Sequence, residues 1–200
     1  MYFWKCFVSG DDNVIYSWKK IVKNSLPLLT IAVIIEIFAG QILLDKQETL
    51  IFLPIFLISI PVINSVGGNI GSVLGARLAS GLHVGYVSNS FKDKEMQYNV
   101  LISLLIAFIT YFILAIVIYF IAVLGNIVSD IALISFIAII LLTGFFLVCV
   151  ISLASVATAF ISYKKGFDPD DMVAPVVTTI GDFLGILFLF FVLGIIGVGI

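Results

Sequence analysis

Charged residues are scarce in this sequence. Lys, Arg, Asp and Glu make up only 11% of its 200 residues, whereas 62% are hydrophobic. A soluble globular domain carries about 25% charged residues, so this chain lacks the polar surface that would face water. Together with a mean hydropathy of +1.27, this scarcity predicts a multi-pass protein of the cell membrane that contacts lipid directly.

Histidine and cysteine are also nearly absent, with one histidine, His83, and two cysteines, Cys6 and Cys149. Zinc and copper sites need several such ligands, so the sequence excludes a metal site of that class. The two cysteines are expected at different depths and therefore not to pair. No basic patch with interleaved aromatics occurs, so nucleic acid is not an expected partner.

Long apolar runs predict an all-α membrane fold with five transmembrane helices. The bilayer core is about 30 Å thick, so each helix needs about 20 apolar residues. Continuous runs such as 131–142 also lack the alternation of a barrel strand. We expect a short segment over 1–24 and one domain over 25–200, with helices at roughly 25–44, 50–79, 100–124, 131–161 and 173–200.

The distribution of Lys and Arg predicts the orientation, because cytoplasmic loops are enriched in both. With the N-terminus inside, nine of the ten Lys and Arg residues fall on the cytoplasmic side and only Lys46 on the other. We therefore expect a cytoplasmic N-terminus and a C-terminus outside. No small-residue cleavage site precedes the end of the first apolar run, so that helix is expected to be retained.

Glycines recur every fourth residue in the second predicted helix, at Gly67, Gly71 and Gly75. Such a stripe lets a neighbouring backbone approach closely, and a packing seam is one interpretation. The adjacent Gly67-Gly68 pair also lowers the cost of local unwinding, which would free carbonyl groups. Asn64 and Asn69 add amide oxygens on either side of the pair.

Carboxylates mark the last predicted helix. Asp168, Asp170 and Asp171 stand at its start, where they act as helix caps or as a secondary cation site. Asp182 is different, because it lies nine residues past Val173, about 14 Å into the bilayer. An ionised carboxylate at that depth needs water, a cation or a hydrogen-bond donor.

The polar residues of the second and last predicted helices are expected at similar depths in the membrane, since Asn69 is about 16 Å from the cytoplasmic end of its own helix. Asn69, the Gly67–Gly71 backbone and Asp182 are therefore expected in one layer, as a site for a hard cation with oxygen ligands. A two-fold dimer would bring two Asp182 carboxylates together, and a divalent cation would neutralise them. Glu36, a second intramembrane acid, has three open roles: packing, proton coupling or the pore rim.

Two stretches resemble the transmembrane domain of MgtE-type magnesium transporters and their eukaryotic solute-carrier relatives. They are Gly68-Asn69-Ile70-Gly71 with Ala76-Arg77-Leu78-Ala79, and Asp168-Pro169 with Ala174 through Asp182. The resemblance implies a homodimer with a pore lined by the second and fifth helices. It also implies that Asp182 and the backbone around Gly68, Asn69 and Thr178 hold hydrated Mg²⁺.

Bacterial members carry long cytoplasmic CBS domains that gate the pore. This sequence has only 24 residues before its first predicted helix, so we expect no such gating. Two other functions stay open: a metal-dependent membrane enzyme that acts on lipid headgroups through Asp168, Asp170 and Asp171, and a non-transporting scaffold. We predict a transporter or channel rather than an enzyme. The sequence leaves open the choice among Mg²⁺, Mn²⁺, Co²⁺ and Ca²⁺, and the direction of transport.

Overall fold

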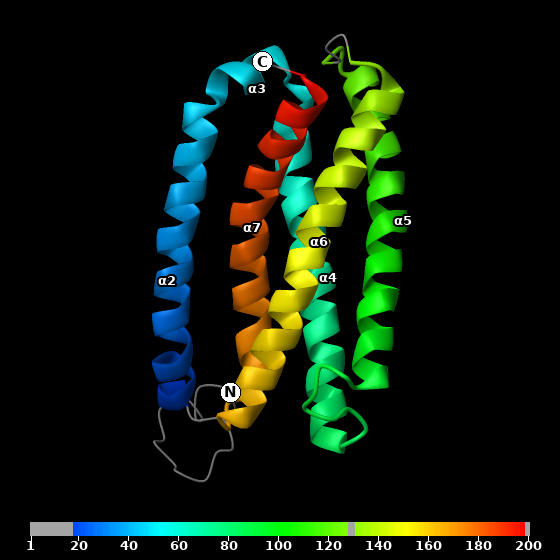
Figure 1. Ribbon diagram of the computed structural model, residues 1–200. Helices are drawn as coiled ribbons and strands as arrows, with labels where there is room; N and C mark the ends of the chain where they lie inside the picture. Colours follow the sequence, from blue (N-terminus) through cyan, green and yellow to red (C-terminus); the bar gives the residue numbers. More distant parts are fainter. Residues whose placement is uncertain (1–17, 128–130, 199–200) are drawn as a thin grey trace, which may run out of the picture.

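The computed structural model describes residues 18–127 and 131–198, and these residues form a bundle of long helices (Figure 1). Most of the predicted N-terminal segment, residues 1–17, lies outside the described residues. Five helices are long and apolar enough to cross a membrane. This confirms the all-α fold with five spans. The elements are α2 (Trp18–Asp45), α3 (Gln47–Phe52), α4 (Ile55–Val84), α5 (Lys94–Leu124), α6 (Leu133–Lys164) and α7 (Pro169–Ile196).

A proline breaks the second predicted helix near its start. The apolar run from residue 50 contains the end of α3, and α4 begins only after Pro54. Proline lacks a backbone N–H and disfavours helical geometry in the residue before it. Leu53 accordingly leaves the helical region, with φ −125° and ψ 63°. The short helix α3 therefore joins the end of α2 to the start of α4 (Figure 1).

Several helices extend beyond the apolar runs that predicted them. α2 begins at Trp18 rather than residue 25, α5 at Lys94 rather than 100, and α7 at Pro169 rather than 173. Hydropathy marks the part of a helix that faces lipid, whereas capping groups set where the helix starts. Asp93 caps α5 by accepting the Met96 N–H, and Asp168 caps α7 by accepting the Asp170 N–H.

The helix α4 lies at the centre of the bundle. It packs against α5, α6 and α7, whereas α2 packs mainly against α7 at one side. Figure 1 shows α2 standing beside α7, with α5 at the opposite edge. Because α4 and α7 share the most extensive contact of any two helices, residues on these two elements are held most firmly with respect to each other.

Small residues and buried polar contacts hold the helices together. The ring of Tyr111 on α5 lies where a Cβ on Gly144 of α6 would be, and its hydroxyl donates to the Ile63 carbonyl at 2.9 Å. The hydroxyl of Ser155 donates to the Gly71 carbonyl, also at 2.9 Å. In lipid, such close approaches and interhelical hydrogen bonds replace the hydrophobic driving force that water provides.

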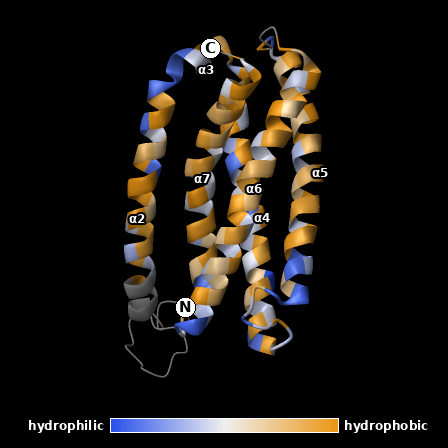
Figure 2. Ribbon diagram, viewed as in Figure 1, coloured by the Kyte–Doolittle hydropathy of each residue, from blue (hydrophilic) through white to orange (hydrophobic). Residues whose placement is uncertain are grey.

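The shafts of the helices are mostly apolar, and polar residues gather around α3 and at the end of the bundle where α5 and α7 begin, as Figure 2 shows. Large apolar side chains cover the outer surface of α5, among them Leu105, Phe108 and Phe112. Such a surface is stable in hydrocarbon and not in water. The chain is therefore a multi-pass membrane protein.

Candidate cation site between α4 and α7

The glycines of α4 lie against α6 and α7. A Cβ on Gly71 would overlap Ile151 and lie 3.1 Å from Val177 Cβ, and a Cβ on Gly75 would overlap Val173. The packing-seam interpretation is therefore the one the structure shows. The helix α4 is unbroken from Ile55 to Val84, so the local unwinding considered for Gly67-Gly68 does not occur.

The backbones of α4 and α7 meet most closely around Gly68. A Cβ placed on Gly68 would lie 3.3 Å from Thr178 Cα, and one placed on Gly181 would lie 3.5 Å from the Gly68 nitrogen. The Gly68 carbonyl accepts the Ser72 hydroxyl at 2.9 Å. The Thr178 hydroxyl donates to the Ala174 carbonyl of its own helix at 2.9 Å. The structure thus brings Gly68 and Thr178 into contact.

Asn64 is the residue of α4 that fixes Asp182. Its Nδ2 donates to the backbone carbonyl of Asp182 at 3.1 Å, and its side chain is only 7% exposed. The amide oxygen lies against Gly185, where a side chain would overlap it, and has no hydrogen-bond partner. This contact holds Asp182 at one depth relative to α4.

Asp182 opens into a groove between α2, α4 and α7 with a volume of about 780 Å³. Four polar side chains line the groove, from Glu36, Gln47, Asn64 and Asp182, and the other lining residues are apolar or glycine. Glu36 and Asp182, the two acidic residues predicted inside the membrane, therefore line the same groove.

Asn69 lies away from this groove. It is exposed on α4, its Nδ2 lies 3.4 Å from Ser65 Oγ, and it lines a separate groove toward α5 with Arg77 and Ser103. α7 meets α4 with Asp182 at the level of Asn64, five residues or about 7.5 Å from Asn69. Counting depth from the helix ends missed this offset, because the ends of α4 and α7 do not lie level.

A face of small and polar side chains, called here the polar face, runs along α4 and the adjoining part of α7, with exposed Val73 of α4 beside it. We define this polar face by the exposed residues Ser65, Asn69, Ala76 and Ser80 of α4 and Ala174 and Thr178 of α7. The four α4 positions fall within a narrow arc of the helix at about 100° per residue. Polar groups facing lipid are unfavourable, so this face is suited to water or to another polar surface.

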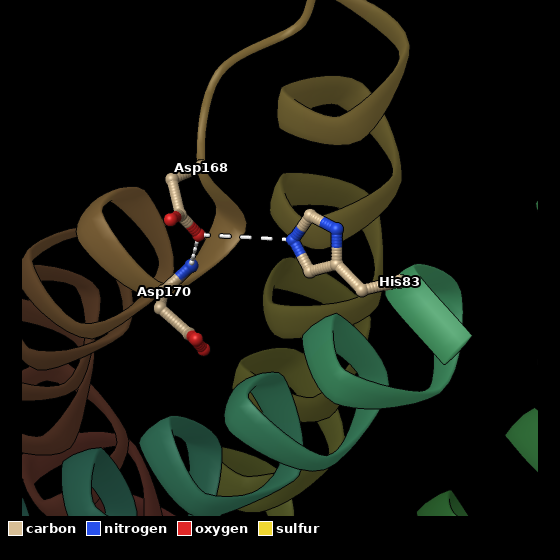
Figure 3. Close-up of polar contacts among 3 residues, drawn as sticks. All are labelled: His83, Asp168 and Asp170. Carbon is tan, nitrogen blue, oxygen red and sulfur yellow. Dashed lines mark hydrogen bonds and ion pairs between the residues drawn. The ribbon is translucent and has the colours of Figure 1, made fainter. Parts of the chain in front are cut away.

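The acidic cluster at the start of α7 acts as a helix cap. Asp168 Oδ1 accepts the Asp170 N–H at 3.1 Å, and the same oxygen lies 4.0 Å from His83 Nε2 at the end of α4 (Figure 3). His83 and Asp168 are 85 residues apart, and no sequence signal predicted this pair. Within residues 18–127 and 131–198, no three His, Cys, Asp or Glu side chains are grouped closely enough to hold a metal ion.

Comparison with known proteins identifies one family. The model of the MgtE family, described as a divalent cation transporter, matches residues 60–192. The matched stretch runs from the first turns of α4 into the last turns of α7, so it contains Asn64, Gly68, Thr178 and Asp182. No curated protein and no solved structure matches the chain.

Proposed function

Because the chain belongs to the MgtE family of divalent cation transporters, we propose that it carries Mg²⁺ through a pore formed by two copies. In this proposal α4 and α7 of each copy line the pore. The ion is held by Asp182 together with oxygens around Gly68, Asn69 and Thr178. The observation that carries the proposal is the position of Asp182, a carboxylate in the middle of a spanning helix, fixed against the backbone of α4.

The depth of Asp182 supports a charged partner. It lies 13 residues after the start of α7 and 14 before its end, about 20 Å from either end. Among the described side chains the ion pair found is the one between His83 and Asp168, so no Lys or Arg neutralises Asp182. A divalent cation in a wet pore supplies the missing positive charge.

The sparse set of protein ligands favours Mg²⁺. Mg²⁺ gives up its water reluctantly and is usually held by one or two carboxylates. Asp182 offers one carboxylate per copy, and no denser cage of acids surrounds it in the described part of the chain. Weak binding through retained water also lets the ion leave, which conduction requires.

The polar face supports a homodimer. Asn69 and Thr178 both lie on it, although within one copy Asn69 does not approach Asp182. A second copy related by a two-fold axis would cover the face and place two sets of these oxygens around one path. The pore of this proposal therefore lies between copies rather than inside one bundle.

The orientation proposed from sequence places the start of α7 in the cytoplasm. Lys92, Lys94, Lys164 and Lys165 lie at that end of the described bundle, whereas Lys46 lies at the other. Asp168, Asp170 and Asp171 are at the same end, where their negative charge raises the local concentration of cations. We assign them this attraction in addition to their capping role.

Liposome flux tests the proposal. Purified protein in liposomes that contain a Mg²⁺-sensitive dye is expected to admit Mg²⁺ far faster than protein-free liposomes. Competition by Mn²⁺, Co²⁺ and Ca²⁺ then ranks the ions. Absence of any divalent cation flux with well-folded protein would contradict the proposal and favour the alternative of a non-transporting scaffold. Turnover of lipid headgroups in the same liposomes would instead favour the enzyme.

A further inference from the structure

We propose that Glu36 of α2 acts with Asp182 as a second cation-binding carboxylate, so that each copy binds a cation in its own groove between α2, α4 and α7 in addition to the ion in the pore between copies. This inference rests on the proposed function and adds a cation site to it. Glu36 lies outside the residues that match the MgtE family model, so the family match does not assign it a role.

The geometry of the groove brings both acids to one space. Glu36 and Asp182 line the same groove from two different helices. Glu36 lies nine residues before the end of α2, and Asn64 lies nine residues after the start of α4. α2 ends and α4 begins at the same end of the bundle (Figure 1), so both residues are about 14 Å from that end. Asn64 is in turn bonded to Asp182.

Two residues that line the groove carry an oxygen without a hydrogen-bond donor. The Asn64 side chain is 93% buried, being 7% exposed, and its Oδ1 has no hydrogen-bond partner. Pro61 has no N–H, so the Leu57 carbonyl one turn earlier has no donor within the helix. Leu57 and Pro61 both line the groove. An oxygen without a donor is unfavourable away from water. The Asn64 oxygen is packed against Gly185, so the Leu57 carbonyl, near the start of α4, is the one that a hydrated cation in the groove would bind.

The groove has room for a hydrated divalent ion and carries negative charge. Six waters occupy about 180 Å³ at about 30 Å³ each, well within the 780 Å³ of the groove. No Lys or Arg is among the described residues that line it. Two ionised carboxylates would repel each other in low dielectric, and one divalent cation neutralises both, whereas one shared proton would leave a net negative charge.

The test is the Mg²⁺ dependence of flux in Glu36→Gln. This variant keeps the size of the side chain and removes its charge. We expect the Mg²⁺ concentration for half-maximal flux to rise about tenfold, with the maximal rate largely retained because Asp182 is intact. Glu48→Gln, an acid on α3 that does not line the groove, is the matched control and is expected to behave as wild type.

A binding measurement distinguishes weaker Mg²⁺ binding from poorer folding of the variant. Mg²⁺ is expected to raise the thermal unfolding temperature of the wild type, and Glu36→Gln should need about tenfold more Mg²⁺ for the same shift. Glu36→Asp, which keeps the charge, should restore most of the affinity. An unchanged half-maximal concentration in folded Glu36→Gln would overturn the inference. So would an altered pH dependence alone, since that would assign Glu36 to a proton. Absence of flux in the wild type would instead contradict the proposed function.

Discussion

Asp182 depends on the residues that hold its backbone. Its carbonyl accepts the Asn64 amide at 3.1 Å, and Gly181 and Gly185 on either side let α4 approach without obstruction. The main chain of Asp182 is therefore held in place relative to α4. In the proposed transporter, this support would fix the depth of the carboxylate in the membrane while it exchanges an ion.

Asn64 and Asn69 should respond differently to replacement by alanine. Asn64→Ala removes a buried interhelical hydrogen bond, so the free energy of unfolding should fall by about 1 kcal/mol and the flux should fall with it. Asn69→Ala removes an exposed amide of the polar face, so its stability should stay near wild type while its flux falls. Denaturation in detergent and flux in liposomes measure the two effects, and equal losses of stability would contradict the assignment.

The sequence identified the ionisable residues that are unfavourable in lipid, but not the residues that they contact. Asp182 and Glu36 could be identified because an ionised group within an apolar helix is unfavourable in lipid whichever helix lies beside it. The hydrogen bond between Asn64 and Asp182 joins residues 118 apart. It depends on the axial offset between α7 and α4. That offset is decided by the packing of Gly68, Gly181 and Gly185 against side chains of another helix, which no local pattern encodes.

At the scale of elements, the glycine seam of α4 sets the distance to its neighbours. Gly75→Ala places a Cβ where the Val173 side chain lies, and overpacking of this kind costs about 1–3 kcal/mol. We therefore expect a clearly lower unfolding temperature for Gly75→Ala. Gly194→Ala in α7 is the matched control, since a Cβ there meets nothing within 4 Å, and it should be neutral or slightly stabilising. Equal effects in the two variants would show that the seam is not tight.

The start of α5 should be sensitive to acid through its cap. Asp93 accepts bonds from the Ser88 hydroxyl, the Met96 N–H and the Ser88 N–H, and these bonds lower the pKa of its carboxyl from 3.8 to about 2. Because the folded pKa is the lower one, the stabilisation is complete above about pH 4 and is lost as the pH falls through about 2.

Comparison of Asp93→Asn with wild type checks this cap. The wild type should unfold at the higher temperature at pH 5, and the difference should shrink toward zero as the pH approaches 2. Thermal unfolding followed by circular dichroism gives both values. A difference that stays constant down to pH 2 would mean that the charge of Asp93 does not stabilise the cap.

The number and type of elements followed from hydropathy, and their ends did not. Five apolar runs correspond to five spanning helices, because hydrocarbon leaves the backbone few alternatives. The separate short helix α3 was not predicted, since the apolar run from residue 50 overlaps its end. The resemblance read from the two motifs is confirmed by the match over residues 60–192. The role of each motif residue stays a prediction.

At the scale of the whole molecule, the polar face is the surface that the proposed second copy would cover. One bundle leaves Ser65, Asn69 and Thr178 exposed at membrane depth, where contact with lipid is unfavourable. A two-fold partner that covers this face would convert an unfavourable surface into a water-filled path. The groove lined by Glu36 lies on the α2 side of the same helices.

Cross-linking tests the arrangement of the two copies. In a background with Cys6 and Cys149 replaced by serine, Ser65→Cys should be joined to its partner by a short bis-maleimide. Ile113→Cys on the outer surface of α5, 55% exposed, is the matched control and should remain monomeric on the gel. Cross-linking through Ile113 but not through Ser65 would place the interface on the wrong side of the bundle.

The most direct measurement is Mg²⁺ flux in liposomes with Asp182→Asn. This variant keeps the shape of the side chain and the backbone bond to Asn64 while removing the charge in the middle of α7. With folding and copy number matched to wild type, we predict loss of nearly all Mg²⁺ flux. Flux equal to that of the wild type would show that the Asp182 carboxylate does not carry the ion.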